Sequence, residues 1–249
     1  MTATHPELAV HKLSDGGVWK DYKGLSFIDV GAKKHWDYIV ALSKESYAIG
    51  FDELNFDYIR YPSDGNMKDV SYMLPPGEAK PQMLKDFFKY LNEQVKPTGA
   101  MLSADLFGMT TTNTDDLNIG QVLENTLPYF DFVAPMVYPS HYPPHFNGWA
   151  DPNKVPYEIV KFAMDSAVKR AKALDVLMTN SAATAATPSV YTVDSVAKLR
   201  PWLQDFDYGG NYDIPEIRAQ IKATYDAGLD SWMLWSSSNR YTLGALDKN

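Results

Sequence analysis

The 249-residue sequence contains no cysteine, which excludes disulfide bonds, thiolate catalysis and zinc–thiolate sites. Basic residues are outnumbered as well: 23 Lys and Arg stand against 31 Asp and Glu, giving a net charge of -8 at pH 7. Because affinity for phosphate groups and anionic lipids rests mainly on Lys and Arg, nucleic acid is not an expected partner.

The chain also lacks an apolar run of membrane length, so membrane insertion is not expected. Its first residues, MTATHPELAVHKLSDGG, have neither the basic start nor the apolar core of a signal peptide. No glycine-rich phosphate loop or nucleotide fingerprint occurs. His141 and His145 stand four residues apart in HYPPH, where two prolines prevent a helix, so neither a metal site nor a cofactor is expected.

The composition supports a large core, with 45% hydrophobic and 13% aromatic residues. Segments with helical period alternate with short segments typical of strands, which predicts parallel β/α units in a single domain over residues 1–249. Helices are expected over 34–49, 82–95, 157–174 and 214–227, and strands over 53–59, 101–106, 130–137, 199–205 and 231–236.

These strands begin with apolar residues and end with polar ones. In a barrel of parallel strands the active site collects where the strands end. With a period of two, GFDELNFDYIRYP (50–62) places Asn55 and Asp57 on the inward face, and MLSADLFG (101–108) places Asp105 there. Further candidates lie at or just beyond the strand ends: Arg60, Tyr138, His141, Gln204, Asp205 and Trp235.

Carboxylates beside aromatic rings suit a carbohydrate ligand. An acid can protonate the glycosidic oxygen, a carboxylate can stabilise an oxocarbenium-like transition state, and Trp or Tyr rings stack on sugar C–H surfaces. We therefore expect a polysaccharide or oligosaccharide as substrate. The substrate-binding candidates are Asn55, Arg60, Tyr138, His141, Gln204 and Trp235.

Five blocks resemble, in the same order, those of a bacterial family of glycosyl hydrolases of TIM-barrel type: GFDELNFDYIRYPSDG, LSADLFG, APMVYPSHYPP, RPWLQDF and GLDSWMLWSSSNRYT. The resemblance extends over most of residues 19–242. It implies a TIM-type (β/α)8 barrel, a glycosidase-like site and a location outside the cytoplasm. The first block is also distantly similar to the chitinase strand that ends in Asp-x-Asp-x-Glu, but Ile59 and Arg60 replace the final Glu, which argues against that mechanism.

A positional analogy with the α-amylase clan assigns catalytic roles to Asp57, Asp105 and Asp205, at the ends of strands 4, 5 and 7. Asp57 is then the expected nucleophile or general base, oriented by Arg60. Asp105, which stands where that clan uses Glu, is the expected general acid, its pKa raised by burial and by the neighbouring carboxylate. A separation of about 5 Å between the two carboxyl groups would indicate a retaining enzyme, and about 6.5–9.5 Å an inverting one.

The resemblance also implies three barrel strands before Glu53, yet only 52 residues precede it. The chain is therefore expected to hold strands 4 to 8 of an incomplete barrel, whose exposed edge would favour self-association. Alternatively, residues 25–30 and 175–196 supply substitute strands. The second of these stretches, rich in Ala, Thr and Ser, otherwise predicts a flexible insertion.

Each carboxylate also has a structural interpretation. Asp57 could form an ion pair with Arg60, Asp105 could hydrogen-bond the following loop, and Asp205 could stabilise a turn. The alternatives to an enzyme are accordingly a catalytically inactive carbohydrate-binding barrel and a scaffold that binds a protein partner.

Overall fold

The computed structural model describes residues 1–183 and 194–246, and the chain divides into two compact units. The first unit contains residues 1–104 and 115–131, and the second contains 105–114 and 132–249. The expectation of one domain over the whole chain stays a prediction.

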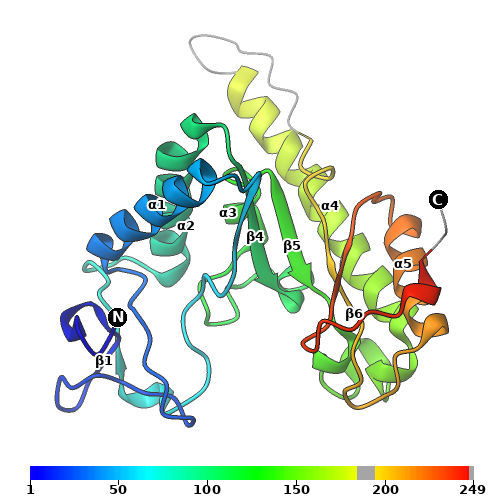
Figure 1. Cartoon of the computed structure of the whole chain (residues 1–249), viewed down its shortest axis with the longest axis horizontal. Coiled ribbons are helices and arrows are strands. Elements are labelled where there is room, and N and C mark those ends of the chain that lie inside the picture. The colour runs from blue at the N-terminus through cyan, green and yellow to red at the C-terminus, as the bar shows by residue number, and fades with distance from the viewer. Residues whose placement is uncertain (184–193, 247–249) are drawn as a thin grey trace. The chain divides into compact units, whose positions relative to one another are not determined.

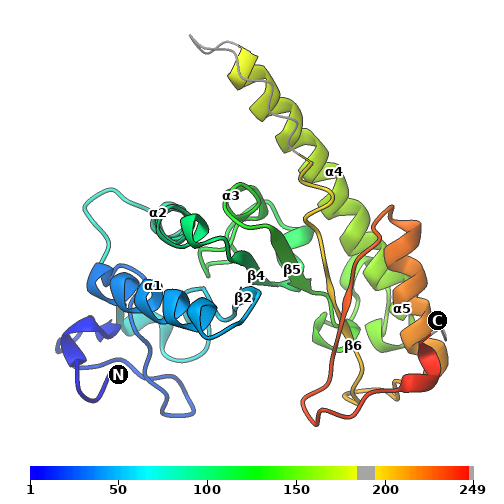
Figure 2. The same ribbon diagram turned by 45° about the horizontal axis from the view of Figure 1, so that its top comes forward.

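The first unit is built on two parallel strands, β2 (Glu53–Phe56) and the first part of β4 (Met101–Phe107), which pair from Glu53 opposite Met101 to Phe56 opposite Ala104. Its helices are α1 (Lys33–Ala48), α2 (Lys80–Val95) and the short α3 (Leu123–Thr126). Helices α1 and α2 lie side by side (Figure 1; Figure 2). A small antiparallel pair, β1 (His11–Lys12) with β3 (Val70–Ser71), forms a separate two-stranded sheet.

Helix α2 buries the apolar stripe that its sequence predicts, because apolar residues recur at helical spacing along one side. The buried residues are Met83, Leu84, Phe87, Phe88, Leu91 and Val95. Aromatic contacts extend this core: the Phe87 ring centre lies 5.3 Å from that of Trp36 on α1, and Phe88 lies 5.3 Å from Phe130. The core of the first unit therefore lies between its two long helices and its strands.

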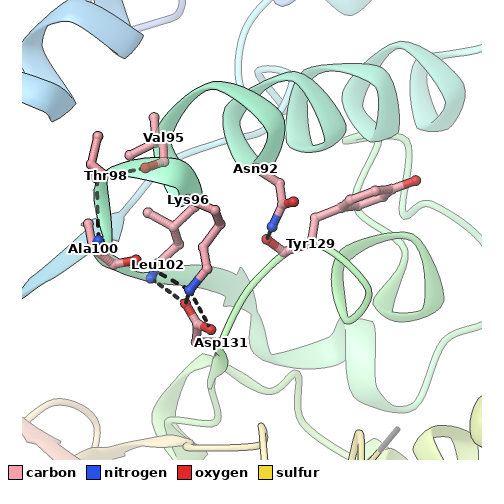
Figure 3. A network of polar contacts seen from close by, with 8 residues as sticks. All are labelled: Asn92, Val95, Lys96, Thr98, Ala100, Leu102, Tyr129 and Asp131. Atoms are coloured by element: carbon pink, nitrogen blue, oxygen red, sulfur yellow. Dashed lines mark hydrogen bonds and ion pairs between the residues drawn. The ribbon is translucent and has the colours of Figure 1, made fainter. Parts of the chain in front are cut away.

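A polar network fastens the end of α2 to the start of β4 (Figure 3). The Lys96 ammonium contacts both carboxylate oxygens of Asp131, at 2.7 and 2.9 Å, and donates to the Ala100 carbonyl at 3.3 Å. The backbone N–H of Leu102 donates to the same Asp131 carboxylate at 2.7 Å. One carboxylate thus holds a helix end and a strand start, which fixes where β4 enters the sheet.

The second unit contains three further parallel strands, β5 (Phe132–Met136), β6 (Trp202–Gln204) and β7 (Met233–Trp235), together with the end of β4. Its helices are α4 (Pro156–Ala183) and α5 (Ile214–Asp226), which pack against each other (Figure 1; Figure 2). In the sheet, Met136 pairs with Trp202, Trp202 with Met233 and Gln204 with Trp235.

Local sequence signals explain where α5 begins and ends. Asp213 followed three residues later by Glu216 is a capping-box sequence, and the box is present: the Asp213 N–H donates to the Glu216 carboxylate at 3.1 Å. The helix ends just before Gly228, whose φ of +84° is a conformation that glycine adopts readily.

All five predicted parallel strands and all four predicted helices are present, with shifted ends. Four of the strands stop earlier than expected, whereas β4 ends one residue later, at Phe107; β2 ends at Phe56 and β6 contains only Trp202–Gln204. Helix α4 continues to Ala183, beyond the predicted end at residue 174, so the stretch 175–196 begins as helix, and residues 184–193 lie outside the described part. The alternative of a substitute strand over residues 25–30 is wrong, because Ile28 makes only an isolated antiparallel bridge to Ala9.

Short 3-10 helices occupy several of the connections: Pro6–Leu8, Met67–Asp69, Lys96–Thr98, Gly108–Thr111, Pro139–His141, Phe146–Gly148, Pro152–Lys154 and Leu243–Ala245. The architecture is α/β, with the parallel β/α units of a TIM-type barrel. The described residues hold five parallel strands, whereas a complete barrel has eight.

Candidate functional site

The first unit carries three of the predicted site residues around the end of β2. Asn55 stands opposite Ser103 of β4, and its Oδ1 accepts a hydrogen bond from the Ser103 hydroxyl at 2.8 Å. The two side chains therefore point to the same face, as the period of two predicted.

Asp57 follows β2 and is exposed. Its Oδ1 accepts the backbone N–H of Tyr58 at 2.6 Å. Arg60 stacks over the Tyr58 ring, 4.3 Å from its centre, and donates to the Tyr61 carbonyl and the Ser63 hydroxyl. No ion pair joins Arg60 to Asp57 within residues 1–183 and 194–246, so neighbouring groups of its own turn hold Arg60 instead.

Asp57 and Arg60 line a cavity of about 280 Å³ in the first unit. The rest of its wall is mainly apolar and comes from residues 27–30, α1, α2, β2 and the residues that follow β2: Phe27, Ile28, Val30, Trp36, Ile39, Phe56, Tyr58, Ile59, Leu84 and Phe87, with the polar Asp29 and His35. Of these wall residues, the sequence had indicated only Asp57 and Arg60 as site residues.

Asp29 is the buried carboxylate of that wall, with 1% of its surface exposed. Its two oxygens accept the backbone N–H groups of Gly31 at 2.8 Å and Met73 at 3.0 Å, and burial raises its pKa. Burial lowers the pKa of His35. An aspartate inside the apolar segment FIDV was the signal that would have identified Asp29 as buried.

In the second unit the candidate carboxylate is Asp105, which is buried and hydrogen-bonded. Asp105 lies on β4 with 5% of its surface exposed, and its Oδ1 accepts a hydrogen bond of 2.7 Å from the indole Nε1–H of Trp202 on β6. Trp202 was not among the predicted site residues, because nothing in the sequence connects positions 97 residues apart.

Trp235 ends β7 and keeps 43% of its surface exposed. Its ring meets that of Trp202 edge to face, with 5.9 Å between ring centres and 80° between planes. The exposed Trp235 indole thus contacts Trp202, the donor to Asp105, and offers an apolar surface of the kind on which sugar rings stack.

Gln204 and Asp205 are buried and hold the local backbone. The Gln204 amide accepts the Ser140 N–H at 3.2 Å and donates to the Phe206 carbonyl at 2.9 Å. The two Asp205 oxygens accept the N–H of Thr242 at 2.9 Å and its hydroxyl at 2.8 Å. Both side chains therefore fix the loops that follow the strands.

Tyr138 and His141 belong to an aromatic cluster after β5. The Tyr138 ring centre lies 5.3 Å from His141 and 5.5 Å from Phe206, and His141 lies 5.9 Å from Tyr208. Desolvation lowers the pKa of His141 from its ordinary value of 6.5, so the imidazole is neutral at pH 7. Its Nδ1 lies 3.0 Å from the Ser140 hydroxyl, and this neutral ring can exchange hydrogen bonds with a sugar hydroxyl.

Two further properties bear on ligands. Across residues 1–183 and 194–246 no three His, Asp or Glu side chains gather closely enough to hold a metal ion. In the same residues, every helix is too short or too polar to span a bilayer.

The sequence matches the model of a family described as "Putative glycosyl hydrolase domain" over residues 1–241. Since this match extends over nearly all of the 249 residues, the chain belongs to that family, and the resemblance inferred from the five blocks is confirmed. No curated protein matches the chain.

Solved structures agree on the fold. The PgaB (BpsB) glycoside hydrolase domain from Bordetella bronchiseptica superposes with a TM-score of 0.55 over 84% of this chain and 59% of its own, at 18% identity. The spore cortex-lytic enzyme SleL from Bacillus megaterium QM B1551 gives a TM-score of 0.53 over 86% of this chain and 52% of its own, at 12% identity. At these identities the likeness shows the fold alone, and it confirms the predicted fold class.

A hypothetical protein from Ruminiclostridium thermocellum ATCC 27405 is 38% identical over 42% of this chain and 50% of its own, with a TM-score of 0.37. The chain thus spans about half of the length of the solved structures that it matches.

Proposed function

We propose that the chain is a glycoside hydrolase that acts on a polysaccharide or oligosaccharide by carboxylate acid/base catalysis. The observation that carries this proposal is the buried Asp105 carboxylate, bonded to an indole whose ring contacts the exposed Trp235. Membership of a glycosyl hydrolase family supports carbohydrate as the substrate class.

Asp105 suits the general acid. An indole N–H can only donate, so Oδ1 of Asp105 is an acceptor, and the Trp202 hydrogen bond fixes the direction of the carboxyl group. A proton carried by this group would pass to the glycosidic oxygen as the bond to the anomeric carbon breaks.

Asp57 suits the nucleophile or general base. It is exposed at a strand end, and the Tyr58 N–H that its Oδ1 accepts fixes the direction of the carboxylate. Trp235, Tyr138 and His141 are proposed to contact the sugar, together with Asn55 and Arg60. Asp205 and Gln204, whose side chains are committed to neighbouring groups, are proposed to position the loops of the site.

The test is release of reducing ends from a broad panel of polysaccharides, with wild type and the Asp57→Asn and Asp105→Asn variants purified in parallel and checked for folding by circular dichroism. We expect turnover by wild type and its loss in both folded variants. A folded wild-type protein that cleaves no glycan would contradict the proposal.

A carbohydrate-binding domain without turnover is the second candidate, because the exposed Trp235 ring alone suffices for stacking on a sugar. In that case calorimetry would find affinity for a glycan that Trp235→Ala abolishes and Asp57→Asn leaves nearly unchanged. The scaffold alternative would show affinity for protein or peptide and none for glycans.

A further inference from the structure

Trp202 differs from the other tryptophans with a described indole hydrogen bond. Trp19 and Trp36 donate to the backbone carbonyls of Asn66 and Val30, and Trp232 donates to the Tyr225 hydroxyl. Trp202 alone among these four donates to a carboxylate, that of Asp105, at 2.7 Å. A carboxyl group can change charge during a reaction, and a hydrogen bond to its charged form is roughly twice as strong as one between neutral groups.

The strand register fixes the direction of the Trp202 side chain. Trp202 pairs with Met233 and Gln204 with Trp235, so Trp202 and Trp235 project from the same face of neighbouring strands. Their edge-to-face contact follows from this diagonal placement. The N–H of one indole therefore reaches a buried carboxylate while its ring touches a partly exposed platform.

We propose that Trp202 is a positioning residue of the glycosidase site: its indole fixes Oδ1 of Asp105, and its ring couples Asp105 to a sugar stacked on Trp235. This inference rests on the proposed function, because it requires Asp105 to be the acid.

The proton balance explains why such a residue would accelerate the reaction. When the anomeric C–O bond breaks, its electron pair stays on the glycosidic oxygen, which takes the proton from the carboxyl group of Asp105. Asp105 is left as a carboxylate, and the Trp202 hydrogen bond strengthens as that charge develops. Water then supplies a hydroxyl group to the anomeric carbon and returns a proton to the carboxylates. An interaction that is stronger in the transition state than in the ground state raises kcat.

The first test detects the hydrogen bond by NMR and does not depend on enzymatic activity. In ¹⁵N-labelled protein, the Trp202→Phe variant assigns the Trp202 indole resonance among those of the six tryptophans. We expect this resonance to shift in Asp105→Asn, because the substitution changes the group that accepts the indole N–H. A Trp202 resonance that Asp105→Asn leaves unchanged would overturn the proposal.

The second test separates positioning from folding. Trp202→Phe keeps an aromatic ring and removes the N–H, so kcat should fall about 10- to 100-fold while KM changes by less than about threefold. Trp232→Phe is the matched control, since it also removes an indole hydrogen bond in the same unit and should keep wild-type kcat.

Wild-type kcat in folded Trp202→Phe would overturn the positioning role even if the bond is seen by NMR. If the folded wild type cleaves no glycan, the proposed function fails and the positioning role fails with it. An unchanged resonance in a protein that does cleave glycans refutes Trp202 alone.

Discussion

The two units surround their candidate carboxylates differently. In the first, Asp57 is exposed after a short strand, and the cavity beside it is mainly apolar. In the second, Asp105 is buried and accepts a hydrogen bond from the Trp202 indole, whose ring contacts the partly exposed Trp235. Burial shields a proton-transferring group from bulk water and a directional donor fixes its orientation, whereas an exposed carboxylate is open to solvent. The difference in surroundings is therefore the physical basis for giving the two residues different roles.

The largest expected effect tests this difference in roles. Asp105→Asn should lower kcat about 10²- to 10⁴-fold on a natural glycan, but much less on an aryl glycoside whose leaving group needs no protonation. Asp57→Asn should reduce turnover of both substrates alike, because its carboxylate acts on the anomeric carbon. Kinetics of both variants on both substrates test this assignment. A stronger dependence on the substrate in Asp57→Asn than in Asp105→Asn would contradict it.

A smaller effect concerns the stability of the first unit. Lys96→Met removes the ammonium that contacts both oxygens of Asp131 and leaves that carboxylate to the Leu102 N–H (Figure 3). We expect the free energy of unfolding to fall by about 1–3 kcal/mol in urea titrations. Lys89→Met is the control, because its 3.7 Å ion pair with Glu93 is exposed and should contribute at most about 0.5 kcal/mol.

Asp57 and Asp105 should also differ in their effect on stability. Asp105→Ala leaves the Trp202 indole N–H without its acceptor and should destabilise the protein by about 1–2 kcal/mol. Asp57→Ala changes an exposed side chain and should stay within about 0.5 kcal/mol of wild type. Equal losses in urea unfolding would show that Asp57 is as deeply integrated as Asp105.

The smallest expected effect is a pH dependence in the second unit. The pKa of His141 is lower in the folded protein than in the unfolded chain, so the unfolded state binds more protons as the pH falls. The contribution of His141 therefore lowers stability progressively below about pH 6.5 until the folded pKa is passed. His141→Gln should reduce the slope of melting temperature against pH between pH 6.5 and 5; an unchanged slope would contradict this assignment.

Local signals in the sequence predicted the elements well. The α2 stripe from Met83 to Val95 and the capping box of Asp213 with Glu216 depend on residues within one or a few turns, so they can be derived from spacing alone. Element ends were less accurate: α4 continues to Ala183 because residues 175–183, although rich in small polar side chains, contain no proline or glycine to stop a helix.

Long-range contacts of the site could not be derived in the same way. The Trp202 indole reaches Asp105 only because β6 and β4 belong to one fold, and the sequence contains no signal for that distance. Likewise, Arg60 was expected to face Asp57. Tyr58 has a backbone φ of +55°, and Arg60 stacks on the Tyr58 ring within the same turn. Asp57, Asp105 and their roles remain proposals for the kinetic tests above.

Asp205 has a consequence for protein engineering. Its backbone N–H donates to the Trp235 carbonyl, and its carboxylate binds Thr242, so one residue fastens both ends of the connection 236–241. The entropic cost of closing a loop grows slowly with length, by about 0.6 kcal/mol for each doubling. Residues 236–241 are therefore a suitable graft position, where longer or different sequences can be introduced beside Trp235 while β7 keeps its register.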